Sequence, residues 1–191
     1  MSDDALWYFA RGSGVVSLIL LTVVVALGVG ARSGRPAFGL PRFAVSLVHR
    51  NAALLSVVFL AGHVVALLFD SYAKLDLIDL VVPFVGEYSP FWQGLGTVAL
   101  DLILAIVATS LLRHRIGAPA WRAVHWAGYL CWPVALAHGL GAGSDSGTWW
   151  LWAISLACLA VVVAAVVWRT SAGFEAFAGR AARRRPLTLS R

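Results

Sequence analysis

The sequence predicts an all-α integral membrane protein built as a bundle of five transmembrane helices. Of its 191 residues, 60% are hydrophobic and only 13% are charged, and its mean hydropathy is +0.82. A soluble domain needs more polar surface than this composition supplies. A helix that crosses about 30 Å of hydrocarbon needs roughly 20 mostly apolar residues, and the chain offers five such stretches between charged or Gly/Pro-rich breaks. The predicted spans are residues 7–30, 46–69, 91–112, 121–140 and 148–168.

The first span is predicted to stay in the protein as a helix rather than to be cleaved as a signal peptide. It follows two acidic residues, Asp3 and Asp4, and it lacks both a basic n-region and a small-residue cleavage site. Cys131 and Cys158 both lie inside predicted spans, where a small buried hydrophobic residue is a better interpretation than a redox group. The net charge of +6 does not indicate a nucleic-acid partner, because the basic residues sit beside membrane spans.

The basic residues predict the orientation of the bundle, because Lys and Arg near helix ends stay on the cytoplasmic side. One side of the predicted bundle carries only Arg11 and Lys74, together with most of the acidic residues. The N-terminus is therefore predicted outside and the C-terminus inside, and the second and fourth spans run in the same direction. The basic residues of the cytoplasmic side are Arg32, Arg35, Arg42, Arg50, Arg113, Arg115, Arg122, Arg169, Arg180, Arg183, Arg184, Arg185 and Arg191.

Four of the five histidines lie in these two parallel spans. His49 and His63 are fourteen residues apart, and His125 and His138 are thirteen apart, which corresponds to about 21 Å and about 19.5 Å of helix rise. His49 therefore shares the inner depth with His125, and His63 shares the outer depth with His138. A lone histidine in a membrane is more often a hydrogen-bonding residue than a ligand. Matched pairs at two depths instead predict two b-type haems, each held by two axial imidazoles.

The angle between the directions of the two histidine side chains differs between the two spans. Fourteen residues return to within roughly 40° of the starting direction, whereas thirteen residues of ideal helix leave two rings about 140° apart. The fourth span contains Gly128 and Pro133, and an internal proline removes one backbone hydrogen bond and bends or rewinds a helix. The sequence predicts that Pro133 makes this adjustment, with different approach angles to the two haems as the alternative.

Three arginines are candidates for the haem propionates, because Arg binds carboxylates through two parallel hydrogen bonds. Arg50 and Arg122 are close in sequence to the inner histidines, and anchoring at the cytoplasmic surface is an equal alternative for both. Arg11 is nearly the only basic residue of the outer side, and the neighbouring Gly12 and Gly14 permit close approach. Arg11 is therefore predicted to lie near the outer haem.

The sequence also makes predictions for two further ionisable residues, for one connecting segment and for the two ends of the chain. Asp101, in the middle of a span, is a proton carrier, a hydrogen-bond partner of a ligand histidine or a structural residue, and His114 is a solvated loop residue. Residues 70–90 are predicted to lie at the outer interface and cap the outer haem. The chain divides into an extracytoplasmic N-terminus (1–6), a transmembrane haem domain (7–168) and a basic cytoplasmic tail (169–191) suited to anionic lipid or an acidic partner.

The histidines lie in two longer runs, HRNAALLSVVFLAGH and LGTVALDLILAIVATSLLRHRIGAPAWRAVHWAGYLCWPVALAHGLGAGSD, and the run LIDLVVPF lies between them. Together with the opening WYFARGSGVVSLILL, these runs resemble the ferric reductase-like transmembrane domain over about residues 6–168. That superfamily includes ferric reductases, the catalytic subunits of NADPH oxidases and the membrane haem subunit of a bacterial methionine sulfoxide reductase system. The resemblance implies that His49 and His125 bind the inner haem and that His63 and His138 bind the outer one.

The resemblance also implies electron transfer from a cytosolic flavin to an acceptor outside, such as ferric iron, oxygen or a redox protein, in a plasma or inner membrane. Larger members continue into flavin and nicotinamide domains, whereas only about 23 residues follow the last predicted span here. The expected donor is therefore a separate flavoprotein carrying FMN or FAD, a free reduced flavin or quinol. No catalytic residue is assigned. The alternatives are a haem-carrying subunit of a larger redox complex and a non-redox membrane protein with structural histidines.

Overall fold

A computed structural model describes residues 3–33, 39–142 and 145–171 of the chain. These residues form helices and connecting turns, without a β-sheet. The elements in chain order are α1 (Asp3–Arg32), α2 (Arg42–Leu68), the 3₁₀ turn η1 (Leu77–Leu80), α3 (Pro90–Leu111), α4 (Arg113–His125), α5 (Gly128–Gly141) and α6 (Trp149–Thr170). The predicted basic tail lies outside the described residues from position 172 onward, as do Arg35 and the other arginines at 180–191.

Four of these helices are long and apolar enough to cross a membrane, so the chain is a multi-pass membrane protein. They are α1, α2, α3 and α6, with 22 to 30 residues each. Apolar side chains cover much of their outer surface: Val58 of α2 and Leu104 of α3 are more than half exposed. In a bilayer this exposed apolar surface faces lipid, which a helix can meet because its backbone groups are satisfied internally.

The predicted fourth span, residues 121–140, is not one helix. It comprises the end of α4 and most of α5, with a turn at residues 126–127 between them. Because α5 has only 14 residues, neither part alone reaches the roughly 20 residues that a crossing requires. The number of five spans therefore stays a prediction. α4 is itself kinked at Gly117, whose φ of 80° is a backbone conformation that glycine adopts without strain.

The turn between α4 and α5, rather than Pro133, contains the departure from regular helix. Three backbone N–H groups in this stretch bond to the carbonyl three residues earlier: those of Ala127, Tyr129 and Leu130. A residue in such a 3₁₀ turn advances by about 120° instead of about 100°. Three residues of this kind add about 60°, which is part of the rotation of about 140° that the thirteen-residue histidine spacing lacks. The turn, and not Pro133 inside α5, therefore makes this part of the adjustment. Different approach angles of the rings stay the prediction for the remaining rotation.

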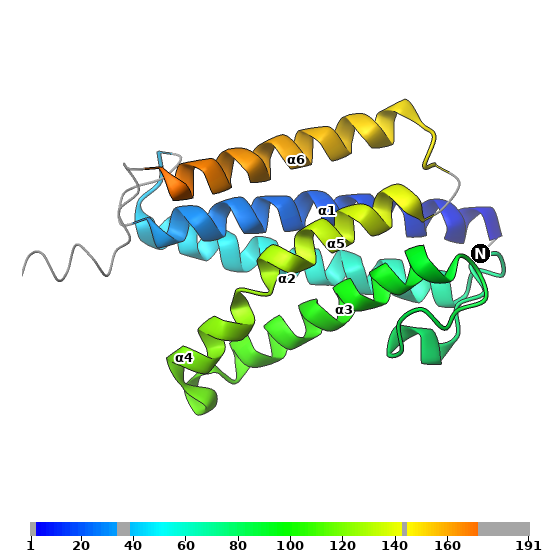
Figure 1. The fold of residues 1–191 in the computed structure, drawn as a ribbon, viewed down its shortest axis with the longest axis horizontal. Coiled ribbons are helices and arrows are strands. Elements are labelled where there is room, and N and C mark those ends of the chain that lie inside the picture. Colours follow the sequence, from blue (N-terminus) through cyan, green and yellow to red (C-terminus); the bar gives the residue numbers. More distant parts are fainter. Residues whose placement is uncertain (1–2, 34–38, 143–144, 172–191) are drawn as a thin grey trace, which may run out of the picture.

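The helices pack as two groups joined through α1. α1 packs along α2 most extensively and also contacts α6 and α5, while α3 packs against α5, α4 and η1. Figure 1 shows α6, α1 and α2 running side by side, and α5 returning from α4 in the same direction as α2. The largest buried cluster lies where α1, α5 and α6 meet and contains Val25, Trp132, Cys158 and Val162. There the Trp132 indole donates to the Thr22 hydroxyl at 2.9 Å.

The segment between α2 and α3 folds back over one end of the bundle. The carbonyl of Asp79 in η1 accepts a hydrogen bond from the Thr97 hydroxyl at 2.6 Å, and the Gln93 side chain donates to the Ala73 carbonyl at 3.1 Å. Both bonds tie the segment to α3. Leu77, on the opposite side of η1, is 74% exposed, so one side of the segment meets the helices and the other is an apolar surface.

Candidate functional site

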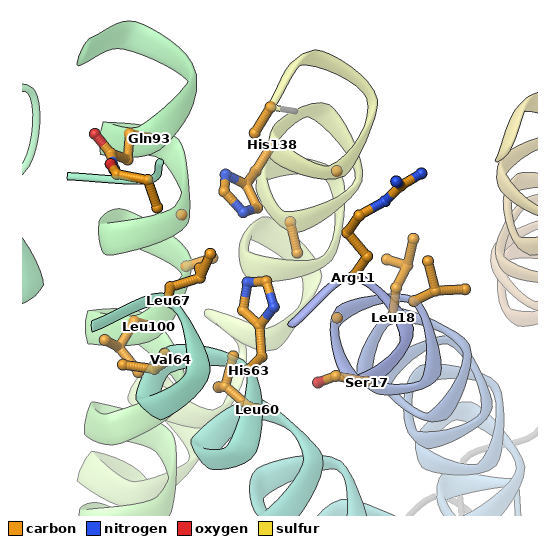
Figure 2. A pocket seen from close by; sticks show the side chains of 18 of the residues that line it. Arg11, Ser17, Leu18, Leu60, His63, Val64, Leu67, Gln93, Leu100 and His138 are labelled. Atoms are coloured by element: carbon orange, nitrogen blue, oxygen red, sulfur yellow. The ribbon is translucent and has the colours of Figure 1, made fainter. Parts of the chain in front are cut away.

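The structure brings the four intramembrane histidines together as two pairs. The ring centroids of His49 and His125 are 6.2 Å apart, and those of His63 and His138 are 6.3 Å apart. Each pair joins a residue of α2 to a residue of the α4–α5 segment. Figure 2 shows His63 of α2 and His138 of α5 pointing toward one another. The pairs are those that the helix-rise argument predicts, and their role as ligands stays a prediction.

Each pair lies in a cavity of its own. The His63–His138 cavity has a volume of about 250 Å³ and is lined by α1, α2, α3, α5, α6 and the segments that follow α2 and α5. The His49–His125 cavity has a volume of about 180 Å³ and is lined by α1, α2, α3, α4, α5 and α6. Leu21 and Ile103 line both cavities. These two side chains therefore form part of the partition between the sites.

Three of the histidines are held by the same local arrangement on a neighbouring helix. Their Nδ1 atoms lie within hydrogen-bond distance of a backbone carbonyl oxygen: His63 at 2.6 Å, His49 at 3.0 Å and His138 at 2.8 Å. A carbonyl only accepts, so Nδ1 carries the proton and Nε2 keeps its lone pair. The accepting carbonyls belong to Ala10, Val24 and Trp92, respectively.

A glycine four residues after each accepting carbonyl makes room for the ring. A Cβ at Gly14 would lie 2.9 Å from the His63 ring, one at Gly96 would lie 2.7 Å from the His138 ring, and one at Gly28 would lie 3.4 Å from the His49 ring. Side chains at the first two positions would displace the histidines. The spacing of fourteen between Gly14 and Gly28 equals the spacing of His49 and His63 on the antiparallel α2. This matched spacing is a sequence signal that the histidines alone did not reveal.

The fourth histidine lacks this support. His125 Nδ1 is buried without a hydrogen-bond partner among the described residues. The position on α3 fourteen residues after Gly96 is Ser110, whose hydroxyl accepts a hydrogen bond from Trp121 Nε1 at 3.2 Å. The Trp121 ring lies 5.0 Å from the His125 ring, tilted by 31°. An aromatic contact therefore replaces the carbonyl and glycine at this position.

The distance between the paired rings fits one six-coordinate metal atom. A metal–nitrogen bond is about 2.0 Å, and an imidazole nitrogen lies roughly 1.2 Å from its ring centre, so two trans imidazoles on one metal have centres about 6.4 Å apart. No group of three or more His, Cys, Asp or Glu side chains in the described part of the chain could hold a bare metal ion. A haem iron needs only two protein ligands because the porphyrin supplies the rest. The residues present therefore fit two haems.

Polar contacts also lie midway between the two histidine levels. On α1, Ser17 lies seven residues from both Ala10 and Val24, and on α2, Ser56 lies seven residues from both His49 and His63. The two serines exchange hydrogen bonds. Ser17 Oγ donates to the Ser56 carbonyl at 3.2 Å, and Ser56 Oγ donates to the Ser17 carbonyl at 3.3 Å. Both side chains are buried. This contact fixes α1 against α2, and with it the height of each carbonyl relative to its histidine.

Two of the three predicted arginines lie at these cavities. Arg11 lines the His63–His138 cavity, where it forms an ion pair with Asp145 and lies 3.9 Å from the Trp7 ring centre. Arg122 lines the His49–His125 cavity. Arg50 is exposed and lines neither cavity, because its neighbour His49 already occupies the inward direction of α2.

Sequence reasoning did not select two further arginines at the His49–His125 cavity, Arg32 and Arg169. Arg169 lies 4.4 Å from the Trp126 ring centre and donates a short hydrogen bond to the Tyr129 hydroxyl. Both arginines end a predicted span, where membrane anchoring is the usual interpretation. Only the packing of α1 and α6 against the other helices brings them to the cavity.

The remaining ionisable candidates lie outside both cavities. Asp101 is exposed on α3 and lines neither one. His114 is exposed on α4 rather than in a loop, and its Nε2 accepts a hydrogen bond from Arg113 Nε at 3.4 Å. Residues of the segment after α2, including Leu75 and Leu80, line the His63–His138 cavity, so this segment covers its end of the site.

Comparison with known proteins agrees with these features. No curated protein and no solved structure matches the chain. Residues 13–136 match the family described as "Ferric reductase like transmembrane component". The matched segment includes His49, His63 and His125 and stops two residues before His138. Because it covers well over half of the sequence, the chain belongs to the ferric reductase-like transmembrane component family.

Proposed function

We propose that the chain is a transmembrane di-haem b-type cytochrome that moves electrons across the membrane. His49 and His125 hold one haem iron, and His63 and His138 hold the other. The observation that carries the proposal is the pair of ring separations, 6.2 Å and 6.3 Å, which suit one iron between each pair. A haem held by these histidines would supply a one-electron redox centre.

The residues around each pair prepare it for this role. The Nδ1–H bonds to the Ala10, Val24 and Trp92 carbonyls fix three rings and leave Nε2 of each ring free to bind an iron. Arg11 and Arg122 pair with propionates of the two haems, while Arg50 anchors α2 at the membrane surface. These are contributions of binding and orientation, because electron transfer makes and breaks no covalent bond in the chain.

The distance between the two sites suits a two-step transfer. His49 and His63 are fourteen residues apart on one continuous helix, which places the two levels about 21 Å apart along α2. Haems held at these two levels would allow an electron to cross the membrane in two steps. Leu21 and Ile103 lie in this interval and exclude water from it.

The arrangement in the membrane follows from the basic residues. α4 and α5 together form the fifth crossing, parallel to α2, and the His49–His125 cavity lies at the cytoplasmic end. The N-terminus is outside the cytoplasm and the C-terminus inside, in a plasma or inner membrane. A reduced flavin, a flavoprotein carrying FMN or FAD, or quinol gives electrons at the cytoplasmic end, and ferric iron, oxygen or a redox protein accepts them outside.

Absorption spectroscopy of the purified chain tests the proposal. The pyridine haemochrome assay should give two haems per chain, and His63→Ala and His138→Ala should lose the same spectral component, while His49→Ala and His125→Ala lose the other. A colourless protein would refute the proposal and favour a non-redox membrane protein with structural histidines. Haem that stays oxidised with reduced flavin and with quinol would instead favour a subunit that needs a further redox partner.

A further inference from the structure

The two cavities differ in the charge of the residues that line them. Three arginines, Arg32, Arg122 and Arg169, line the His49–His125 cavity, and no Asp or Glu does so among its described lining residues. The described lining of the His63–His138 cavity contains Arg11 with two carboxylates, Asp70 and Asp145. The formal charge of the lining is therefore +3 at the first cavity and −1 at the second.

The two cavities also differ in the hydrogen bonds made by their histidines. Both rings of the His63–His138 pair donate Nδ1–H to a backbone carbonyl, at 2.6 Å and 2.8 Å. In the other pair only His49 does so, at 3.0 Å, and the Nδ1 atom of His125 has no partner in the described part of the chain. This second difference does not depend on the count of charged residues.

Both differences act in the same direction on a redox centre held by the rings. A centre that gains an electron is stabilised by nearby positive charge and destabilised by nearby negative charge, and the effect is larger in a membrane interior than in water. A hydrogen bond from Nδ1–H to a carbonyl makes the ring a stronger electron donor to the metal, which favours the oxidised state. The propionates add equal negative charge at both sites, so they do not cancel the difference.

We infer that the His49–His125 site has the higher reduction potential of the two, and that Arg169 and Asp145 are positioning residues that maintain the difference. This inference rests on the proposed function. Arg169 is held between α5 and α6 by the Trp126 ring and the Tyr129 hydroxyl, and Asp145 is held by its ion pair with Arg11. An electron shared between the sites therefore resides at the His49–His125 site until an acceptor withdraws it.

A spectroelectrochemical titration of the full chain in detergent micelles or nanodiscs tests this assignment. The wild-type protein should give two one-electron steps of unequal potential. Arg169→Gln should lower the upper step more than the lower step, and Asp145→Asn should raise the lower step more than the upper step, because the effect of a charge falls with distance. One unit charge at roughly 12 Å and an effective dielectric constant of 20 changes the reduced-to-oxidised ratio about tenfold, and a tenfold change is 59 mV for a one-electron couple.

Three further variants separate the effect of charge from the effect of packing. Arg169→Lys keeps the charge and should leave the upper step near its wild-type position. If Arg169→Gln does not fold, Arg122→Gln replaces it as the test, because the Arg122 side chain is exposed. Arg122→Gln should then lower the upper step. Glu87→Gln is the matched control for Asp145→Asn, because Glu87 is exposed and lines neither cavity; it should move neither step.

The outcomes distinguish this inference from the proposed function. A protein that binds two haems with coincident steps, or in which Arg169→Gln moves the lower step more than the upper step, retains the proposed function and overturns the inference. A protein without haem overturns both.

Discussion

Replacing Gly14 by alanine is the sharpest test of how the structure holds its histidines. The new Cβ would lie 2.9 Å from Nδ1 and 3.0 Å from Cε1 of His63, whereas non-bonded heavy atoms prefer about 3.5–4.0 Å. The ring must therefore move by about half an ångström or more. This movement lengthens the 2.6 Å hydrogen bond from His63 Nδ1 to the Ala10 carbonyl and shifts Nε2 away from the position that faces His138.

The size of the effect follows from three contributions. Overpacking a tight contact costs about 1–3 kcal/mol, and loss of the hydrogen bond costs about 1 kcal/mol. Alanine in place of glycine stabilises a helix by about 1 kcal/mol. The sum is a net loss of about 1–3 kcal/mol at the His63–His138 site, which weakens haem affinity there by about 5- to 150-fold.

The haem-to-protein ratio of the purified variant measures this effect. We expect Gly14→Ala to fall from two haems per chain toward one and to lose the spectral component that His63→Ala also loses. Gly12→Ala is the matched control: it makes the same change two residues away on α1, and a Cβ there meets nothing within 4 Å. It should keep both haems and unfold at the same or a higher temperature. The reasoning fails if Gly14→Ala keeps its full haem content, or if both variants lose haem equally.

Three further substitutions test other contacts of the site. Gly96→Ala should reduce haem content as Gly14→Ala does, because its Cβ would lie 2.7 Å from the His138 ring. Gly28→Ala should keep most of its haem, because its Cβ would lie 3.4 Å from the His49 ring. Equal haem-to-protein ratios for these two variants in the haemochrome assay would contradict this expectation. Trp132→Phe removes the hydrogen bond to Thr22 and should lower the free energy of unfolding by about 1 kcal/mol in thermal unfolding followed by circular dichroism. Its haem content should not change, because Trp132 lines neither cavity.

The geometry of the histidine pairs was accessible from sequence because it depends only on helix rise and direction. A spacing of fourteen on α2 and thirteen on the α4–α5 segment gives nearly equal heights, and the basic residues make the two segments parallel. The structure pairs His49 with His125 and His63 with His138. Neither argument needed any knowledge of side-chain packing.

The rotation within the α4–α5 segment could be recognised as a problem but not located. A proline is the most visible helix breaker in a sequence, so Pro133 was the natural choice. The structure instead tightens the helix between Val124 and Leu130. The carbonyl that lacks the N–H of Pro133 is that of Tyr129, four residues earlier, so the missing bond and the tight turn overlap.

The arginines mark the limit of reasoning from sequence proximity. Arg50 follows a site histidine directly, yet adjacent residues point about 100° apart on a helix, and Arg50 is exposed. Arg169 is 44 positions after His125 in the sequence and nevertheless lines the same cavity. Its placement depends on how α6 packs against α1, which no local pattern encodes.

The sparse contact between α2 and α3 has a consequence for biogenesis. Both helices line both cavities, yet α2 packs along α1 and α3 packs along α5. A ligand that occupies the cavities bridges the two groups of helices and stabilises the assembled state in proportion to its concentration and affinity. If the chain binds haem as proposed, newly inserted chains without haem should have a less stable contact between α2 and α3 and should be degraded faster by membrane proteases than chains that have bound it.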